Sequence, residues 1–169
     1  MKEVIFAQYD VVIDEFENLL ASFDQDEINA VPAPGSWTAA QVGVHVIKSN
    51  RSIAQAMNME SQPADRPPDE RIQELKDVFL NFEVKLNSPD FILPEAGLYK
   101  KEKLLQDLGD SVGALRAVSR KVSLSGTIRH IAFGDITKLE LMHFVVYHTQ
   151  RHTVQLNKIA RAVKKDYVP

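Results

Sequence analysis

Two histidines four residues apart, His148 and His152, are the residues of this sequence that most directly suggest chemistry. In a helix, side chains at this spacing differ by only about 40° around the axis and lie roughly one turn apart. Two such imidazoles can share one cation. Both histidines fall on a stripe of apolar residues with helical periodicity, so their rings are expected to be buried. Buried ring nitrogens need bonds, and a metal ion is one way to provide them.

The same stripe fits a second interpretation, in which the rings are core histidines bonded to backbone or hydroxyl groups. The spacing alone does not separate the two, since such a pair also arises by chance. No glutamate lies between His148 and His152, so the general base of the zinc-protease motif HExxH is missing. Glu140 would project about 80° away from the histidine face, which makes it a poor ligand or base. No catalytic residue is therefore assigned from the sequence.

A third histidine, His45, lies on the apolar face of another expected helix. Metal sites in helical bundles are built in this way, from side chains on facing helices. The other histidines are expected elsewhere. His143 would point about 140° away from His148, toward the surface or a partner. His130 lies in a connection, where a structural role is favoured over a place at the mouth of a pocket.

Other side chains near these histidines have weaker functional interpretations. Gln41 and Gln155 lie about one turn from a histidine and could orient a ligand or substrate, although both positions are more typical of a helix surface. Trp37 is expected to pack at the start of a helix rather than to contact substrate. Tyr147 and Arg151 flank the histidines and could reach the rim of a pocket, with a surface ion pair as an equal alternative for Arg151.

Composition limits both the fold and the chemistry. The chain has 169 residues, of which 44% are hydrophobic and 25% charged, as is typical of one folded domain covering residues 1–169. Without cysteine, any metal must be bound by histidine, carboxylate or water. The net charge of −3 and the scattered basic residues argue against nucleic acid as a partner. No apolar run could cross a membrane and the N-terminus does not resemble a signal peptide, so we expect a cytoplasmic protein.

The spacing of apolar residues predicts an all-α protein. Long amphipathic helices are expected over residues 4–23, 38–58, 101–121 and 137–164, with a shorter one over residues 69–86. Thr38 and Gln41 form a capping-box pattern. Residues 91–93 are expected to pack against the body, residues 128–134 are ambiguous between an extended turn and a short helix, and no strand of convincing length is expected. The fold class is therefore a four-helix bundle with an additional short helix.

Three segments, taken in order, resemble the DinB-like (YfiT-like) family of metalloenzymes. Residues 34–45 read PGSWTAAQVGVH, similar to the family's tryptophan-led start of the second helix and its first metal histidine. Residues 133–137 read FGDIT, and residues 148–156 read HTQRHTVQL, similar to the family's final histidine pair followed by Gln-Leu. The resemblance covers nearly the whole chain. It implies a DinB/YfiT-like four-helix bundle in which His45, His148 and His152 bind one divalent ion, usually zinc or nickel.

The resemblance also implies a class of reaction. Relatives with assigned activities are mostly bacillithiol S-transferases and mycothiol-dependent maleylpyruvate isomerases, and dimers are common among them. We therefore expect a thiol-dependent S-transferase with a small-molecule substrate, a low-molecular-weight thiol as co-substrate, and assembly as a homodimer. The sequence shows no motif for a particular thiol. A metal-dependent hydrolase and a non-catalytic, stress-related binding module are the alternatives.

Overall fold

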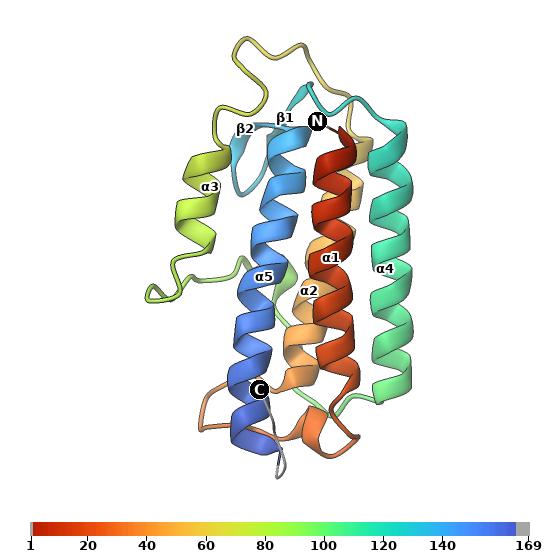
Figure 1. Ribbon diagram of the computed structural model, residues 1–169, viewed down its shortest axis with the longest axis vertical. Helices are drawn as coiled ribbons and strands as arrows, with labels where there is room; N and C mark the ends of the chain where they lie inside the picture. The colour runs from red at the N-terminus through yellow and green to blue at the C-terminus, as the bar shows by residue number, and fades with distance from the viewer. Residues whose placement is uncertain (1, 165–169) are drawn as a thin grey trace.

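Four long helices run side by side in the computed structural model, which describes residues 2–164 (Figure 1). They are α1 (Lys2–Ala21), α2 (Ala39–Asn58), α4 (Lys101–Lys121) and α5 (Lys138–Val163). The main contacts join α1 to α5 and α2 to α4, and α2 also contacts α5. The predicted four-helix bundle is confirmed. None of the helices in the described part of the chain is long and apolar enough to cross a membrane.

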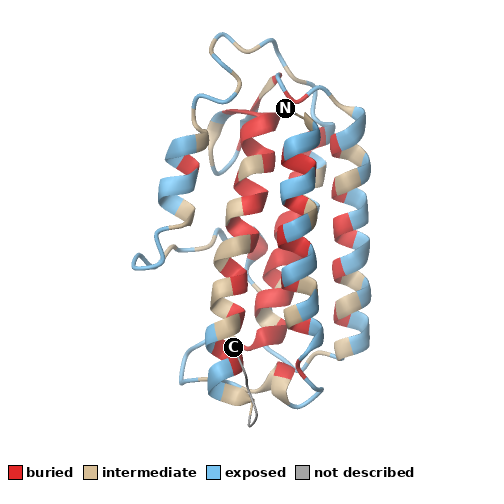
Figure 2. Ribbon diagram, viewed as in Figure 1, coloured by how far each residue is buried: buried red, intermediate tan, exposed pale blue. Residues whose placement is uncertain are grey.

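One face of each long helix contributes to a shared core, and Figure 2 shows the buried residues on the faces turned inward. In α1 this face carries Ile5, Tyr9, Phe16 and Leu20, all of them buried. Their separations of four and seven residues keep them on one side of a helix with 3.6 residues per turn. Burying an aliphatic or aromatic side chain of this size contributes about 1.5–3 kcal/mol.

Gly43 sets how closely α2 approaches its neighbours. A Cβ atom at this position would lie 3.0 Å from Cδ2 of Leu20 and 3.3 Å from Cδ2 of Leu104. Carbon atoms pack best at about 3.5–4.0 Å, so a side chain here would require the ends of Leu20 and Leu104 to shift by a few tenths of an ångström. Gly43 lies two residues before His45, so this close packing holds the part of α2 that carries a candidate ligand.

Capping boxes fix the starts of α2 and α5. At α2, the Thr38 hydroxyl accepts a hydrogen bond from the Gln41 backbone N–H, and the Gln41 side chain accepts one from the Thr38 N–H, as the sequence pattern predicted. Thr137 and Glu140 make the same reciprocal pair at α5. Each box satisfies two backbone donors that would otherwise lack a partner.

The third helix is shorter than predicted. α3 spans Ile72–Phe79 rather than residues 69–86, and Phe82, expected on its apolar face, is 45% exposed. The chain leaves the helix where Arg151 of α5 donates hydrogen bonds to three backbone carbonyls. These are the carbonyls of Phe79, Asn81 and Val84. Because a continuing helix would use these oxygens for its own bonds, their capture by Arg151 favours an extended connection.

A short antiparallel hairpin precedes α5, in the region where the sequence was ambiguous. β1 (Thr127–His130) pairs with β2 (Gly134–Thr137), so the extended alternative holds here and two short strands form where none was expected. Gly134 has a φ of +66°, a backbone angle that residues with side chains rarely adopt, so it helps the chain to reverse. Strands of four residues are too short to give a clear alternation of apolar and polar residues, which explains why the pattern missed them.

A buried carboxylate fastens the connection before α3 to the start of α5. Glu140 is fully buried and accepts hydrogen bonds from both terminal nitrogens of Arg66, at 2.6 and 2.7 Å, and from the Arg71 N–H at 2.8 Å. Burial raises the pKa of Glu140, but the hydrogen bonds and the charge of Arg66 outweigh it and hold the pKa below its ordinary value of 4.5. Both oxygens are thus engaged in structural contacts, in agreement with the expectation that Glu140 is neither ligand nor base.

Replacing Glu140 by Gln should destabilise the protein, because an amide nitrogen would face donors where a carboxylate oxygen now accepts. We expect the free energy of unfolding in urea at pH 7 to fall by about 2 kcal/mol. A carboxyl whose pKa is lowered by folding contributes stability above its ordinary pKa of 4.5, and this contribution is lost as the pH falls through the folded value. The difference between wild type and variant should therefore shrink below pH 4.5.

Glu74→Gln is the matched control, since Glu74 pairs with Arg71 at 2.9 Å but is exposed. Its effect on the free energy of unfolding should stay within about 0.5 kcal/mol. Equal losses in the two variants would contradict a structural role specific to Glu140.

Candidate metal centre

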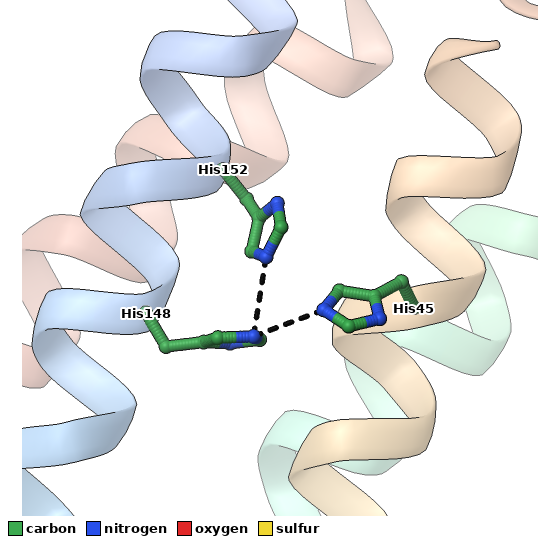
Figure 3. Close-up of side chains that lie close together, drawn as sticks. All are labelled: His45, His148 and His152. Atoms are coloured by element: carbon green, nitrogen blue, oxygen red, sulfur yellow. Dashed lines mark hydrogen bonds between the residues drawn. The ribbon is translucent and has the colours of Figure 1, made fainter. Parts of the chain in front are cut away.

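The three histidines predicted to bind a metal converge inside the bundle. His45 comes from α2, and His148 and His152 come from α5 (Figure 3). The Nε2 atom of His148 lies 3.0 Å from Nε2 of His45 and 3.1 Å from Nε2 of His152. The three candidate ligand atoms lie within 4.8 Å of one another, and all three residues are buried. Side chains far apart in the sequence thus present one group of nitrogens.

Hydrogen bonds at the outer nitrogens fix the protonation of two rings. Nδ1 of His45 lies 2.9 Å from the carbonyl oxygen of Ile92, and Nδ1 of His152 lies 2.8 Å from Oε1 of Gln155. Because these oxygens only accept hydrogen bonds, each Nδ1 carries the hydrogen and each Nε2 presents a lone pair. The Nε2 atom of His148 carries at most one hydrogen, so it can donate to only one of the two lone pairs that face it, those of His45 and His152. Hydrogen bonds between the rings therefore cannot satisfy all three Nε2 atoms, whereas a shared cation would.

The separations between the nitrogens fit a single divalent ion. Imidazole nitrogens bind zinc at about 2.0–2.1 Å, which places two ligands of a tetrahedral ion about 3.3 Å apart. The separations of 3.0 and 3.1 Å from the His148 nitrogen are close to this value, and the third separation is within 4.8 Å. An all-imidazole donor set suits zinc, nickel, copper or iron, and three protein ligands leave a coordination position for water or substrate.

Burial keeps these imidazoles neutral. It lowers the pKa of His45, and it holds the pKa of His148 well below its usual range, with His152 and His45 adding to the effect. Burial also lowers the pKa of His152 to about 3, against the opposing effect of the bond to Gln155. Neutral imidazole is the form that binds a metal, so at neutral pH no proton has to leave these rings first.

Aromatic rings enclose the cluster. The ring centroid of Trp37 lies 5.1 Å from that of His45, and the centroid of Phe144 lies 5.0 Å from that of His148. Trp37 also packs against the hydrophobic core, so the expected packing role includes a contact with a candidate ligand. An apolar shell of this kind limits the access of water and strengthens electrostatic interactions within the site.

Of the two groups that orient the rings, the Gln155 side chain and the Ile92 carbonyl, only Gln155 could be identified from the sequence. Gln155 lies one turn after His152, and this spacing predicted that it could orient a ligand. The Ile92 carbonyl comes from η2 (Asp90–Ile92), a short 3-10 turn, and had no side-chain signal. The expectation that residues 91–93 pack against the body holds for Ile92, which is buried, but not for Phe91 and Leu93, which are 46% and 39% exposed. Gln41 serves the helix cap and does not join the cluster.

Two hollows meet at the cluster. The inner cavity, of about 270 Å³, is lined by all three histidines and by apolar side chains that include Phe79, Phe133 and Phe144. The outer groove, of about 830 Å³, is lined by residues that include Pro32, Ala33, Gly35, Ser36, Trp37 and Gln155. Both hollows share His152, Arg151 and residues 86–88. No aspartate or glutamate of the described chain lines either one.

The remaining candidates lie around these hollows or apart from them. His130 is buried in β1, accepts a hydrogen bond from the Ala132 N–H at Nδ1 and stacks on Phe133, so it forms part of the cavity wall in addition to its structural contacts. His143 is half-buried beside Tyr147 and stays outside the cluster. Tyr147 lines neither hollow. Arg151 lines both, and its partners are backbone carbonyls rather than a surface carboxylate.

Known proteins share this architecture. TT2238, whose crystal structure is described as a four-helix bundle protein, superposes with a TM-score of 0.60 and 18% identity, over 92% of this chain and 98% of that one. YfiT from Bacillus subtilis, described as a probable metal-dependent hydrolase with an unusual four-helix bundle topology, gives a TM-score of 0.63 and 17% identity, over 95% of this chain and 86% of that one. At these identities the similarity concerns the fold.

No curated protein matches this chain. The family model described as the DinB superfamily matches residues 8–156, which includes all three histidines of the cluster. The chain therefore belongs to the DinB superfamily.

Proposed function

We propose that His45, His148 and His152 bind one divalent ion, with zinc or nickel as the leading candidates, and that the protein is a thiol-dependent S-transferase. In this proposal a low-molecular-weight thiol loses its proton to solvent water, its sulfur forms a bond to an electrophilic carbon, and the leaving group departs from that carbon with the electron pair of the broken bond. A bound ion would supply Lewis acidity, which lowers the pKa of a thiol at the open coordination position.

The observation that carries the proposal is the meeting of two hollows at His152, both without a carboxylate. Two hollows at one cluster provide room for two reactants, as transfer requires. A thiol that is acidified at the site needs no carboxylate base beside it, so the lining is compatible with thiol chemistry. The residues of the chain would then hold and orient the ligands and exclude water, with Ile92 and Gln155 fixing two of the rings.

A metal-dependent hydrolase is the second candidate. It is favoured by the similarity of fold to YfiT, which is described as a probable metal-dependent hydrolase. In this case His130, a cavity-lining imidazole whose pKa is lowered by burial, would be the candidate proton-transfer group outside the cluster. A non-catalytic binding module is the third reading, and measurement of metal and turnover separates it from both.

His148→Ala should abolish tight metal binding, because the variant loses the nitrogen that lies within 3.1 Å of both others. The measurement is metal analysis of protein purified without a nickel column and equilibrated with equimolar zinc. His143→Ala is the control, since His143 lies on the same helix but outside the cluster. We expect about one ion per chain in wild type and control, and a small fraction of one in the variant. Equal retention in the two variants would refute the three-histidine site.

Gln155→Leu should weaken zinc binding by about tenfold without abolishing it, because His152 would lose the acceptor that fixes its tautomer. Competition with a chelator of known affinity measures this effect. Gln155→Glu keeps an acceptor oxygen at the same position, so its affinity should stay within about threefold of wild type or exceed it. Equal weakening in both variants would show that Gln155 does not act through this hydrogen bond.

The activity is tested by incubating zinc- or nickel-loaded protein with a panel of thiols and 1-chloro-2,4-dinitrobenzene. Transfer consumes thiol and electrophile together and releases chloride, and it should be lost in His148→Ala and after chelation. Hydrolysis of 4-nitrophenyl acetate without thiol would instead support the hydrolase. A protein that binds metal but is inert in both assays would favour the binding module.

A further inference from the structure

We propose that the outer groove binds the anionic part of the thiol co-substrate, a carboxylate or a phosphate, while its sulfur lies at the histidine cluster. This inference rests on the proposed function and specifies the chemical class of the thiol.

The charged side chains that line the outer groove are all basic. They are Lys85, Arg151 and Lys158, and no described aspartate or glutamate lines the groove with them. In a protein with a net charge of −3, a hollow with this lining has a charge opposite to that of the whole chain. Positive charges held around one hollow attract anions and raise their local concentration.

These positive charges have no carboxylate partner in the described part of the chain. Arg151 donates only to backbone carbonyls, which satisfy its hydrogens but leave its charge in place. Lys85 and Lys158 form no ion pair there. Other lysines of the same chain do form them: Lys48 with Glu95, Lys103 with Asp107 and Lys164 with Glu27. The groove beside the candidate metal centre thus holds three cations whose charge no described carboxylate offsets.

The neutral polar groups of the groove add hydrogen-bond donors. Gln155 uses its oxygen for His152, so its amide N–H groups remain for a ligand. Ser36 and Ser88 contribute hydroxyl groups that can donate as well. Donors combined with positive charge recognise carboxylate and phosphate oxygens, and charge-assisted hydrogen bonds of this kind are the stronger ones.

The position of the groove explains why the anion would belong to a reactant. His152 and Arg151 line both hollows, so a molecule in the groove lies against one of the three histidines of the cluster. The inner cavity differs in character, because Arg151 is its only lysine, arginine, aspartate or glutamate in the described lining and its walls are mostly apolar. This division places an anionic thiol in the groove and an apolar electrophile in the cavity.

The test compares thiols with and without their anionic groups on the zinc-loaded full chain. Glutathione is paired with its diethyl ester, which masks the carboxylates, and 4'-phosphopantetheine is paired with pantetheine, which lacks the phosphate. Isothermal titration should show that the anionic member of at least one pair binds more tightly. The pair that shows the larger difference identifies carboxylate or phosphate as the preferred group.

The groove variant is the double substitution Lys85→Ala/Lys158→Ala. The control is Lys76→Ala/Lys121→Ala, which removes the same charge from exposed lysines that line neither hollow. The first variant should bind the preferred anionic thiol about tenfold more weakly, as expected for two partly exposed charge contacts. Its affinity for the thiol that lacks the anionic group, and its zinc content, should match those of wild type. The control should match wild type throughout.

The outcomes separate this inference from the proposed function. If both members of each pair bind equally well and the groove variant changes nothing, the anion site is refuted and the thiol function survives. If no thiol binds a zinc-loaded wild type, the thiol function fails, and titration with succinate and inorganic phosphate then tests the groove alone. Equal binding of these ions by wild type and groove variant, or binding of neither, would overturn the anion site as well.

Discussion

The structure depends on the need to satisfy the nitrogens of three neutral imidazoles in the interior of a helical bundle. A buried ring nitrogen without a partner costs free energy, so each must be bonded to something. The fold supplies acceptors for the outer nitrogens of His45 and His152, and it leaves the inner nitrogens 3.0 and 3.1 Å from the nitrogen of His148. This arrangement requires α2 and α5 to lie against each other, although 103 residues separate His45 from His148.

α5 organises this region because it carries ligands and also holds the walls around them. Near its start, Glu140 binds Arg66 and the backbone of Arg71, which fastens the chain just before α3. Three turns later, Arg151 binds backbone carbonyls just after α3. The short helix is therefore fixed at both ends, and its Phe79 contributes to the inner cavity. The connection that follows leads to η2 and to the carbonyl that orients His45, so one helix determines the position of elements from several parts of the chain.

Much of the bundle and of the histidine cluster was accessible from the sequence, for different reasons. Helical spacing of apolar residues located the four long helices, since burial of one face gives a strong periodic signal. The same spacing placed His45, His148 and His152 on inward faces. The end of α3 was missed because a distant arginine, not a local residue, captures the carbonyls there. Ile92 was missed as a ring partner because a backbone oxygen leaves no trace in residue type, and the basic groove was missed because its residues come from separate segments.

The close approach at Gly43 makes the positions of the histidines depend in part on the absence of a side chain at this residue. The space left by one absent methyl group brings the backbone of α2 to within van der Waals reach of Leu20 and Leu104. Three ligand atoms within 4.8 Å tolerate little displacement, since a shift of a few tenths of an ångström in a metal–ligand distance is already significant. If the cluster holds an ion, the steric volume at Gly43 therefore contributes to its geometry in addition to the imidazoles. A substitution at Gly43, on the opposite side of α2, could therefore change the coordination geometry even though all three histidines are retained.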